Sequence, residues 1–396
     1  MPAVSRTSNI PFHRTTASVN LDALRALAAF VVLFGHWRAM FFWDYWQLHA
    51  SRKFWYLPDI VGFAGHQAVI IFFVLSGYLI GKSVLRKVNS HAWSWREYLL
   101  HRVTRLWIVL IPALLLCALW DTIGIHSGAA PLLYNGSLLS VNHETLDVIR
   151  RHTVGSFFSN LFFLQGTATS TFGSDGPLWS LANEFWYYLL FPCALMAVRF
   201  EESPRSRILH AVGFAAMALL ISPGILVLFP CWLVGVAAAY FRWPEIPGRL
   251  RPWIIAGYVV LFLYLAKAQY LPEPLSDYVL ADATLLLMMT LLSYRSEARE
   301  SIWSRLSRRS AGFSYTLYLV HFPFLTLVAA FVIHDHRWKP TPAHTAMGLG
   351  ILVLTVAYAY GVASVTEFHT AKLREWIGNR FAFFFARARE GVKVAE

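Results

Sequence analysis

Ten apolar runs dominate this sequence, and each is long enough, or nearly long enough, to cross a lipid bilayer as a helix. Spanning the hydrocarbon core takes about 20 mostly apolar residues, and a helix in lipid satisfies its own backbone hydrogen bonds. The sequence therefore predicts an all-α polytopic membrane protein, a bundle of about ten transmembrane helices. The runs are 21–39, 59–81, 104–120, 178–198, 208–222, 224–241, 252–267, 278–294, 311–333 and 343–364.

The composition excludes an ordinary soluble protein. Hydrophobic residues make up 57% of the 396-residue chain and charged residues only 14%, whereas soluble domains carry about 25% charged residues. The net charge of +12 does not predict nucleic-acid binding, because Lys and Arg stand between apolar runs. Cys117, Cys193 and Cys231 lie far apart in apolar stretches, which argues against a disulfide framework and a cysteine metal site. We expect no metal.

The loop charges predict how the chain is oriented, because cytoplasmic loops carry the excess of Lys and Arg. With the N-terminus inside, the inner segments hold 25 of these residues and the outer segments 8. This bias would collapse if the short apolar run 155–165 crossed the membrane, so we expect an interfacial or re-entrant helix there. The expected organisation is a cytoplasmic tail (1–20), a transmembrane domain (21–366) and a basic amphipathic cytoplasmic tail (367–396).

Arg25 and His36 are the first candidate functional residues, because ionisable groups inside a membrane are costly. They are eleven residues apart, which places them on one face of a helix and about 16 Å apart along its axis. Arginine stays protonated and suits an anion or a carbonyl oxygen, whereas histidine can take up a proton near neutral pH. The alternative is a snorkelling arginine and an interfacial histidine.

Four more polar or aromatic positions lie within predicted spans. Glu184 is expected at the depth of His36, where it could orient the imidazole or stabilise its protonated form. Ser76 precedes a glycine, and this pair either permits close helix packing or admits a ligand. His321 stands before a proline and is either a substrate contact or a hydrogen-bonded packing residue. Trp179 is a candidate for stacking on a substrate.

A basic cluster precedes the third predicted span. Arg102 and Arg105 are three residues apart, so they share one helix face at the membrane edge. Part of this cluster serves topology, but guanidinium groups also match the geometry of phosphate oxygens. The two arginines are therefore candidates for binding the phosphates of a nucleotide-like donor.

Several of these segments together resemble the acyltransferase-3 family of membrane O-acyltransferases. The opening segment from Leu21 to His36 resembles that family's R-x10-H signature, and the match extends along nearly the whole chain. Asn183-Glu184 stands where the family often has two acidic residues. The other matching segments are 72–80 (FFVLSGYLI), 101–106 (HRVTRL) with Pro112, 178–192 (LWSLANEFWYYLLFP) and 314–323 (SYTLYLVHFP), which contains Tyr315.

The resemblance implies a bacterial inner-membrane enzyme that transfers an acyl group, usually acetyl, from cytoplasmic acyl-CoA to a hydroxyl of a glycan or glycolipid. It implies the stand-alone form, without a fused SGNH domain. In this hypothesis Arg102 and Arg105 bind the donor phosphates, and Arg25 and Ser76 line its path. His36 acts as base with Glu184 positioning it, and Trp179, His321 and Tyr315 contact the substrates. In a variant of this hypothesis, His36 is transiently acylated before the acyl group reaches the acceptor hydroxyl.

Two functions from other classes remain open on the sequence. A transporter or flippase of a polysaccharide or lipid-linked sugar would also have many helices and intramembrane charges, but no repeat symmetry is evident. A membrane glycosyltransferase would be expected to place an acidic pair in its first outer loop. Asp44 and Asp59 lie in that loop but fifteen residues apart. A test for CoA release by the purified protein would distinguish the acyltransferase, the transporter and the glycosyltransferase.

Overall fold

The structure, a computed structural model, describes residues 15–48, 55–141, 144–267, 271–294, 296 and 300–380. Ten long helices make up the bundle, namely α1 (Thr16–Phe41), α3 (Gly65–Asn89), α4 (Trp95–Ser127), α8 (Trp179–Val198), α9 (Pro204–Leu220), α10 (Pro223–Tyr240), α11 (Arg251–Lys267), α12 (Glu273–Leu292), α14 (Ser314–Val332) and α15 (Pro342–Val365). The shorter elements are α2 (Tyr56–Phe63), α5 (Pro131–Tyr134), β1 (Asn135–Val141), β2 (Glu144–Asp147), α6 (Val148–Arg151), α7 (Val154–Leu161) and α13 (Ile302–Gly312).

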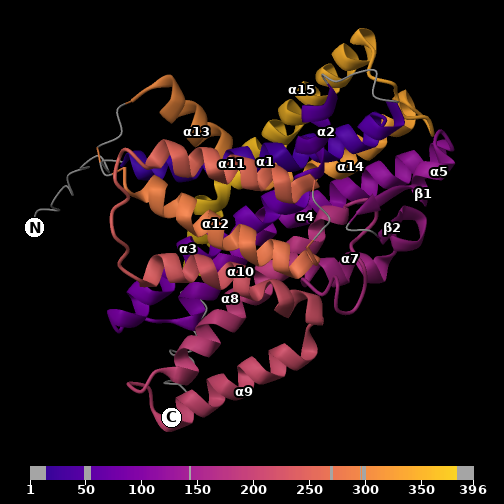
Figure 1. The fold of residues 1–396 in the computed structure, drawn as a ribbon. Helices are drawn as coiled ribbons and strands as arrows, with labels where there is room; N and C mark the ends of the chain where they lie inside the picture. Colours follow the sequence, from indigo (N-terminus) through magenta and orange to yellow (C-terminus); the bar gives the residue numbers. More distant parts are fainter. Residues whose placement is uncertain are drawn as a thin grey trace, which may run out of the picture.

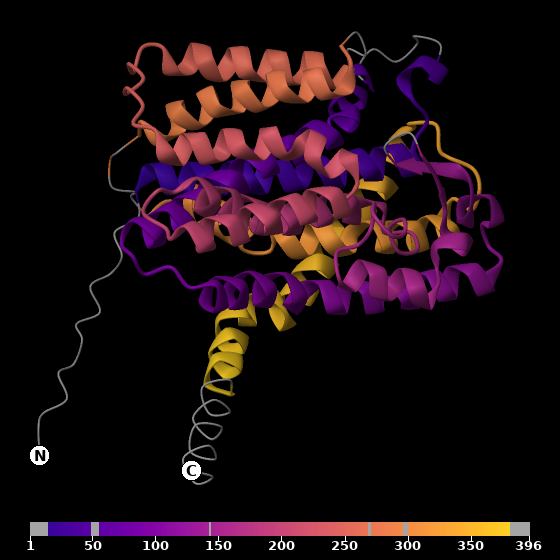
Figure 2. The ribbon, with the colours of Figure 1, turned by 90° about the horizontal axis from the view of Figure 1, so that it is seen from below.

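The long helices lie side by side, and a two-stranded antiparallel sheet of β1 and β2 sits at one end of the bundle (Figures 1 and 2). We call this the sheet end. The opposite end, where α1 and α4 begin and α3 finishes, is called the basic end. Residues 370–380 form a helical segment that leads away from the bundle (Figure 2).

The predicted fold class is confirmed, since each of the ten predicted runs overlaps one of the ten long helices. Eight spans in the described residues are long and apolar enough to cross a membrane. The helices α9 and α11 are the two that fall short, at 17 residues each. The run 155–165 contains the short helix α7, of 8 residues. The residues of both tails at 1–14 and 381–396 lie outside the described part of the chain.

Short polar side chains mark where several helices begin. Thr15, Ser94, Ser203 and Thr341 each accept a hydrogen bond from the backbone N–H three residues further on. Such caps satisfy donors that the first helical turn leaves unpaired. Ser301 does the same for α13 in a reciprocal capping box with Ser304, and this basic helix was missed because it has no apolar run.

The helices α3 and α10 pack closely through two glycines. A Cβ at Gly77 would lie 1.9 Å from the carbonyl oxygen of Trp232, and one at Gly235 would lie 2.0 Å from that of Val74. Both contacts involve backbone atoms, which cannot move aside as a flexible side chain can. Small residues at such crossings let two backbones approach, which is how helices associate tightly in membranes.

We expect Gly77→Ala to destabilise the fold by about 1–3 kcal/mol, because the added methyl would force α3 and α10 apart. The measurement is thermal unfolding of the purified protein in detergent. Gly257→Ala in α11 is the matched control, since nothing lies within 4 Å of a Cβ there. An equal melting temperature for Gly77→Ala and Gly257→Ala would contradict the close approach of α3 and α10.

A buried acid, Asp175, lies at the sheet end just before α8. Its side chain is fully buried, and both carboxylate oxygens are without a hydrogen-bond partner among the described residues. Burial, and then the charge of nearby Asp121, raise the pKa of Asp175 well above its ordinary value. A carboxyl whose pKa is higher in the folded state favours folding when protonated.

The stability of the protein should therefore fall as the pH rises from about 4, the ordinary pKa of an aspartate, toward the raised folded-state pKa. We expect Asp175→Asn to raise the melting temperature, and to raise it more at pH 8 than at pH 5, because asparagine resembles the protonated acid. Thermal unfolding at both pH values checks this. A lower melting temperature for the variant at pH 8 would count against a buried, costly carboxylate.

Candidate active site

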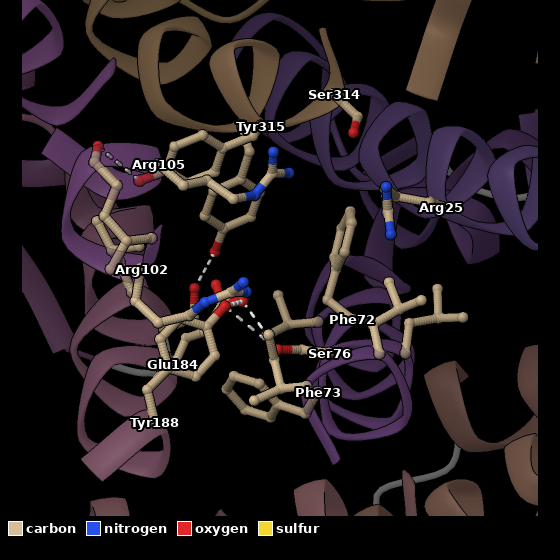
Figure 3. A pocket seen from close by; sticks show the side chains of 18 residues that line it. Arg25, Phe72, Phe73, Ser76, Arg102, Arg105, Glu184, Tyr188, Ser314 and Tyr315 are labelled. Atoms are coloured by element: carbon tan, nitrogen blue, oxygen red, sulfur yellow. Dashed lines mark hydrogen bonds between the residues drawn. The ribbon is translucent and has the colours of Figure 1, made fainter. Parts of the chain in front are cut away.

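A cavity of about 220 Å³ lies among α1, α3, α4, α8 and α14 (Figure 3). Its lining residues on α1 and α4 lie nearer the basic end, where these two helices begin. Its polar lining residues are Arg25, Ser76, Arg102, Arg105, Ser180, Glu184, Tyr188, Ser314, Tyr315 and Tyr318. The structure thus brings together six of the residues predicted from the sequence, namely Arg25, Ser76, Arg102, Arg105, Glu184 and Tyr315.

The lining of this cavity is cationic. Three guanidinium groups, from Arg25 on α1 and from Arg102 and Arg105 on α4, face one carboxylate, that of Glu184. Arg25 lies within electrostatic range of Arg105 and of three carboxylates, those of Asp22, Glu367 and Glu184. Arg105 also pairs with Glu367 at 3.9 Å. Because arginine cannot lose its proton in a protein, the three positive charges are permanent, and among the lining residues only Glu184 opposes them. The cavity therefore suits an anion, or a ligand with developing negative charge.

Aromatic rings hold the two arginines of α4 in place. The Arg102 guanidinium lies 5.8 Å from the ring centroid of Tyr98 and 5.9 Å from that of Tyr188. The Arg105 guanidinium lies 5.9 Å from the Tyr315 ring. Nε of Arg102 is buried and has no partner among the described residues. It is therefore a hydrogen-bond donor that still lacks an acceptor.

Glu184 is bound to the cavity wall and not to a histidine. Its Oε1 accepts a hydrogen bond from Ser76 Oγ at 2.9 Å and another from the Tyr188 hydroxyl. Ser76 in turn accepts one from Trp232 Nε1 at 3.2 Å. The expected contact between Glu184 and His36 is therefore wrong, because α8 turns Glu184 toward α3 and α4. Tyr188, one turn after Glu184, is a wall residue that the sequence reading missed.

His36 instead pairs with His321 of α14. His36 Nδ1 lies 2.8 Å from His321 Nε2, and His321 Nδ1 lies 2.8 Å from the carbonyl oxygen of Leu317. A carbonyl only accepts, so His321 Nδ1 carries the proton. With both rings neutral, His321 Nε2 accepts from His36 Nδ1, and the lone pair of His36 is left on Nε2. Part of the His36 side chain remains accessible, so this nitrogen can serve as a base.

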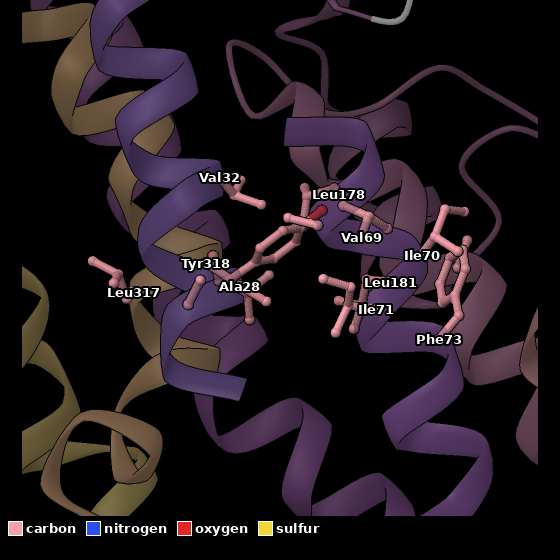
Figure 4. Packing of buried hydrophobic residues seen from close by; sticks show 14 of the residues in the cluster. Ala28, Val32, Val69, Ile70, Ile71, Phe73, Leu178, Leu181, Leu317 and Tyr318 are labelled. Carbon is pink, nitrogen blue, oxygen red and sulfur yellow. The ribbon is translucent and has the colours of Figure 1, made fainter. Parts of the chain in front are cut away.

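A packed apolar layer separates the cavity from this histidine pair. Val32, one turn before His36 on α1, is buried, and it faces Val69, Leu178 and Tyr318 (Figure 4). Val69 and Tyr318 line the cavity itself. The Tyr318 ring lies 6.1 Å from that of His321, and its hydroxyl lies 2.6 Å from Ser180 Oγ. Neither His36 nor His321 lines the cavity, although Arg25, on the same helix as His36, does.

The remaining predicted residues are also accounted for. Tyr315 donates a hydrogen bond from its hydroxyl to the carbonyl oxygen of Leu106 at 3.2 Å. Trp179 lies outside the cationic cavity and stacks on His66 near the sheet end. Cys117, Cys193 and Cys231 are buried and free.

Two sequence features do not form a second centre. Asp44 and Asp59 both pair with the buried Arg38, at 2.7 and 3.1 Å, and Asp59 also contacts Lys267 at 3.4 Å. These carboxylates are neutralised by cations, which weakens the glycosyltransferase alternative. Across the described parts of the chain, no group of three or more His, Cys, Asp or Glu residues could hold a metal ion.

Comparison with known proteins gives consistent matches. A family model described as an acyltransferase domain matches residues 18–362. A peptidoglycan O-acetyltransferase of Listeria monocytogenes is 26% identical over 345 residues, covering 78% of this chain and 49% of that protein. A putative peptidoglycan O-acetyltransferase of Bacillus subtilis is 25% identical, covering 67% of this chain and 44% of that protein.

An O-acetyl transferase of Shigella phage Sf6 is 23% identical over 324 residues and covers 78% of this chain and 84% of the phage protein. The chain therefore spans about half the length of the two peptidoglycan O-acetyltransferases and most of the length of the phage protein. No solved structure matches the chain.

Proposed function

The chain belongs to the acyltransferase family, and from this premise we propose that it is a membrane O-acetyltransferase that moves acetyl from acetyl-CoA to a hydroxyl of a cell-envelope or exported glycan. The matching relatives support both halves of the proposal, since they are O-acetyltransferases and two of them act on, or are thought to act on, peptidoglycan. The lipid bilayer is its setting, and we place it in a bacterial inner membrane with both termini in the cytoplasm.

The observation that carries the donor assignment is the cationic cavity near the basic end. Acetyl-CoA carries several negative charges on its phosphates, and guanidinium groups bind phosphate oxygens in a bidentate manner. Arg102 offers an unpartnered Nε at the cavity wall, and Arg105 lies one turn away on the same helix face. In the proposal these two arginines bind the phosphates, and the acyl end extends past Arg25 and Ser76.

The proposed mechanism is supported by the hydrogen bonds of the histidine pair, which leave the lone pair of His36 on Nε2. His36 Nε2 takes the proton from the acceptor hydroxyl, and the oxygen then attacks the thioester carbonyl carbon. The C–S bond breaks, the acetyl stays on the oxygen, and the CoA sulfur leaves as a thiolate that recovers the proton. His321 fixes the tautomer of His36 from the other side. In the variant mechanism, His36 itself carries the acetyl for a time.

The apolar layer must open for the two substrates to meet. Tyr318 is the side chain that connects the cavity wall to the histidine pair, and its hydroxyl is held by Ser180 and by the carbonyl oxygen of Pro177 at 3.0 Å. In the proposal, donor binding displaces Tyr318 and admits the acetyl group. Glu184 does not position His36 in this proposal, and it belongs to the cavity wall through its hydrogen bonds with Ser76 and Tyr188.

The test is CoA release by the purified protein. With acetyl-CoA and a glycan acceptor we expect free CoA to accumulate in step with acetylated sugar, measured by a thiol reagent and by mass spectrometry. A transporter or flippase would move its sugar across vesicles without releasing CoA. Absence of CoA release in the presence of envelope glycans from the source cells would reject the proposal.

A further inference from the structure

A second pocket, of about 290 Å³, lies close to the sheet end among α3, α8, α10 and α12. Unlike the cationic cavity, it contains two carboxylates and no arginine or lysine. Its polar and aromatic lining residues are His66, Gln165, Trp179, Asn183, Ser222, Glu273 and Asp277.

His66 and Asp277 form a tight dyad in this pocket. His66 Nε2 lies 3.0 and 3.1 Å from the two carboxylate oxygens of Asp277. The Asp277 side chain is only 2% exposed, whereas Glu273, 4.0 Å from His66, is 57% exposed. The pocket thus contains one buried carboxylate, which is held by His66, and one largely exposed carboxylate. Such a lining repels phosphate groups but accepts hydrogen bonds from hydroxyls.

A flat aromatic wall stands beside the dyad. The rings of His66 and Trp179 stack with their centroids 5.8 Å apart and an interplanar angle of 12°. Phe73 meets the Trp179 ring edge-on at 6.2 Å, which fixes the orientation of the indole. Aromatic faces next to carboxylate and amide oxygens are suited to sugars, which present apolar C–H faces and polar hydroxyl edges.

Gln165 supplies the observation that points to a ligand. Its side chain is 1% exposed, and its Nε2 donates to the carbonyl oxygen of Leu178 at 2.9 Å. Its Oε1 is buried and has no partner among the described residues, and the same is true of His66 Nδ1. A buried acceptor without a partner costs about 1–3 kcal/mol, and nearly all such groups are satisfied by protein, water or ligand. A hydroxyl in the pocket would satisfy Gln165 Oε1.

The pocket is adjacent to the proposed reaction centre through two shared elements. Trp179 and Asn183 line the pocket, whereas their chain neighbours Ser180 and Glu184 line the cationic cavity. Successive helix residues point about 100° apart, so the two sites lie on neighbouring faces of the same stretch of α8. On the other side, a Cβ at Gly35 would lie 3.9 Å from Gly65 Cα, which brings together the segments that carry His36 and His66.

We propose that this pocket is the acceptor subsite and binds a neutral, hydroxyl-rich sugar unit of the glycan. The inference rests on the proposed function and deepens it. Trp179 stacks on the sugar ring, Gln165 Oε1 and the carboxylates accept from its hydroxyls, and the His66–Asp277 dyad holds the ring in place for His36. The donor enters near the basic end and the acceptor near the sheet end, and the two meet at α8.

The experiment uses the full-length protein in nanodiscs with chitotriose, cellotriose and maltotriose as soluble acceptors. Binding of each sugar is measured by calorimetry without donor, and CoA release from acetyl-CoA is measured with the same sugars. Asp277→Asn and Gln165→Leu should each raise Kd and KM for the preferred sugar about tenfold, with KM for acetyl-CoA unchanged. Asp282→Asn is the matched control, because Asp282 is an exposed residue of the same helix and does not line the pocket.

The outcomes separate the subsite from the proposed function. Sugar binding that Asp277→Asn weakens, without CoA release by the wild type, supports the subsite and rejects acetyl transfer. CoA release with an unchanged sugar KM in both pocket variants rejects the subsite and keeps the transfer. If the wild type neither binds nor acetylates any of the sugars, both are rejected. A rise in KM for acetyl-CoA equal to that for the sugar would also overturn the subsite.

Discussion

Replacing His36 with alanine is expected to lower the turnover of acetyl-CoA and glycan by about 10³-fold, the range that a positioned general base contributes. The structural reason is the hydrogen-bond order that leaves the lone pair on His36 Nε2. The measurement is the initial rate of CoA release at saturating concentrations of both substrates.

Variants of the partner residue His321 should lower turnover less than His36→Ala does. His321→Ala removes the acceptor that fixes the His36 tautomer, so we expect a smaller loss, about tenfold, whereas His321→Gln keeps an acceptor oxygen and should recover part of it. The control is His126→Ala, because His126 is an exposed residue near the end of α4. Near-full turnover by His36→Ala would eliminate both the base and the acyl-histidine mechanism.

The second large effect is expected on KM for acetyl-CoA when a guanidinium group is removed from the cationic cavity. We expect Arg102→Gln and Arg25→Gln each to raise KM for acetyl-CoA about 10- to 100-fold, the value of a charge-assisted hydrogen bond in a buried site. The two arginines differ in what they should contact. Arg102 is assigned to the phosphates and Arg25 to the acyl end, so the donor S-acetylpantetheine, which has no phosphate, distinguishes them.

With S-acetylpantetheine, Arg102→Gln should behave like the wild type, whereas Arg25→Gln should remain impaired. Arg86→Gln is the control, since Arg86 is exposed close to the basic end and does not line the cavity. If Arg102→Gln is equally impaired with both donors, the phosphate assignment is wrong. If KM for acetyl-CoA stays constant in both variants, the cavity is not the donor site.

Much of the bundle could be predicted from the sequence because hydropathy is a local property. Runs of about 20 apolar residues identify helices without reference to their neighbours. The same holds for Arg102 and Arg105, whose shared helix face follows from their spacing. Elements without an apolar run were missed for the same reason, and these include α13 and the small sheet of β1 and β2.

Partners across helices could not be predicted in this way. Sequence position gives the depth of Glu184 and His36 in the membrane, but not the direction in which each helix face points. The partner of His36 is 285 residues away, on α14, and the partners of Glu184 lie on α3 and on its own helix. Gln165 ends the short apolar run 155–165, but hydropathy does not show that its side chain faces a pocket formed with α8, α10 and α12.

The packed layer of Val32, Val69, Leu178 and Tyr318 has a consequence for the energy supply of the cell. A membrane potential is worth about 2.3 kcal/mol for each charge at 100 mV, and a continuous water path through an enzyme would dissipate it as leaking protons. The dry layer insulates the two polar compartments from each other. In the proposal, an acetyl group, being uncharged, passes this layer when Tyr318 moves, while hydrated ions remain excluded. The proposed transfer across the bilayer therefore takes place without a channel for ions.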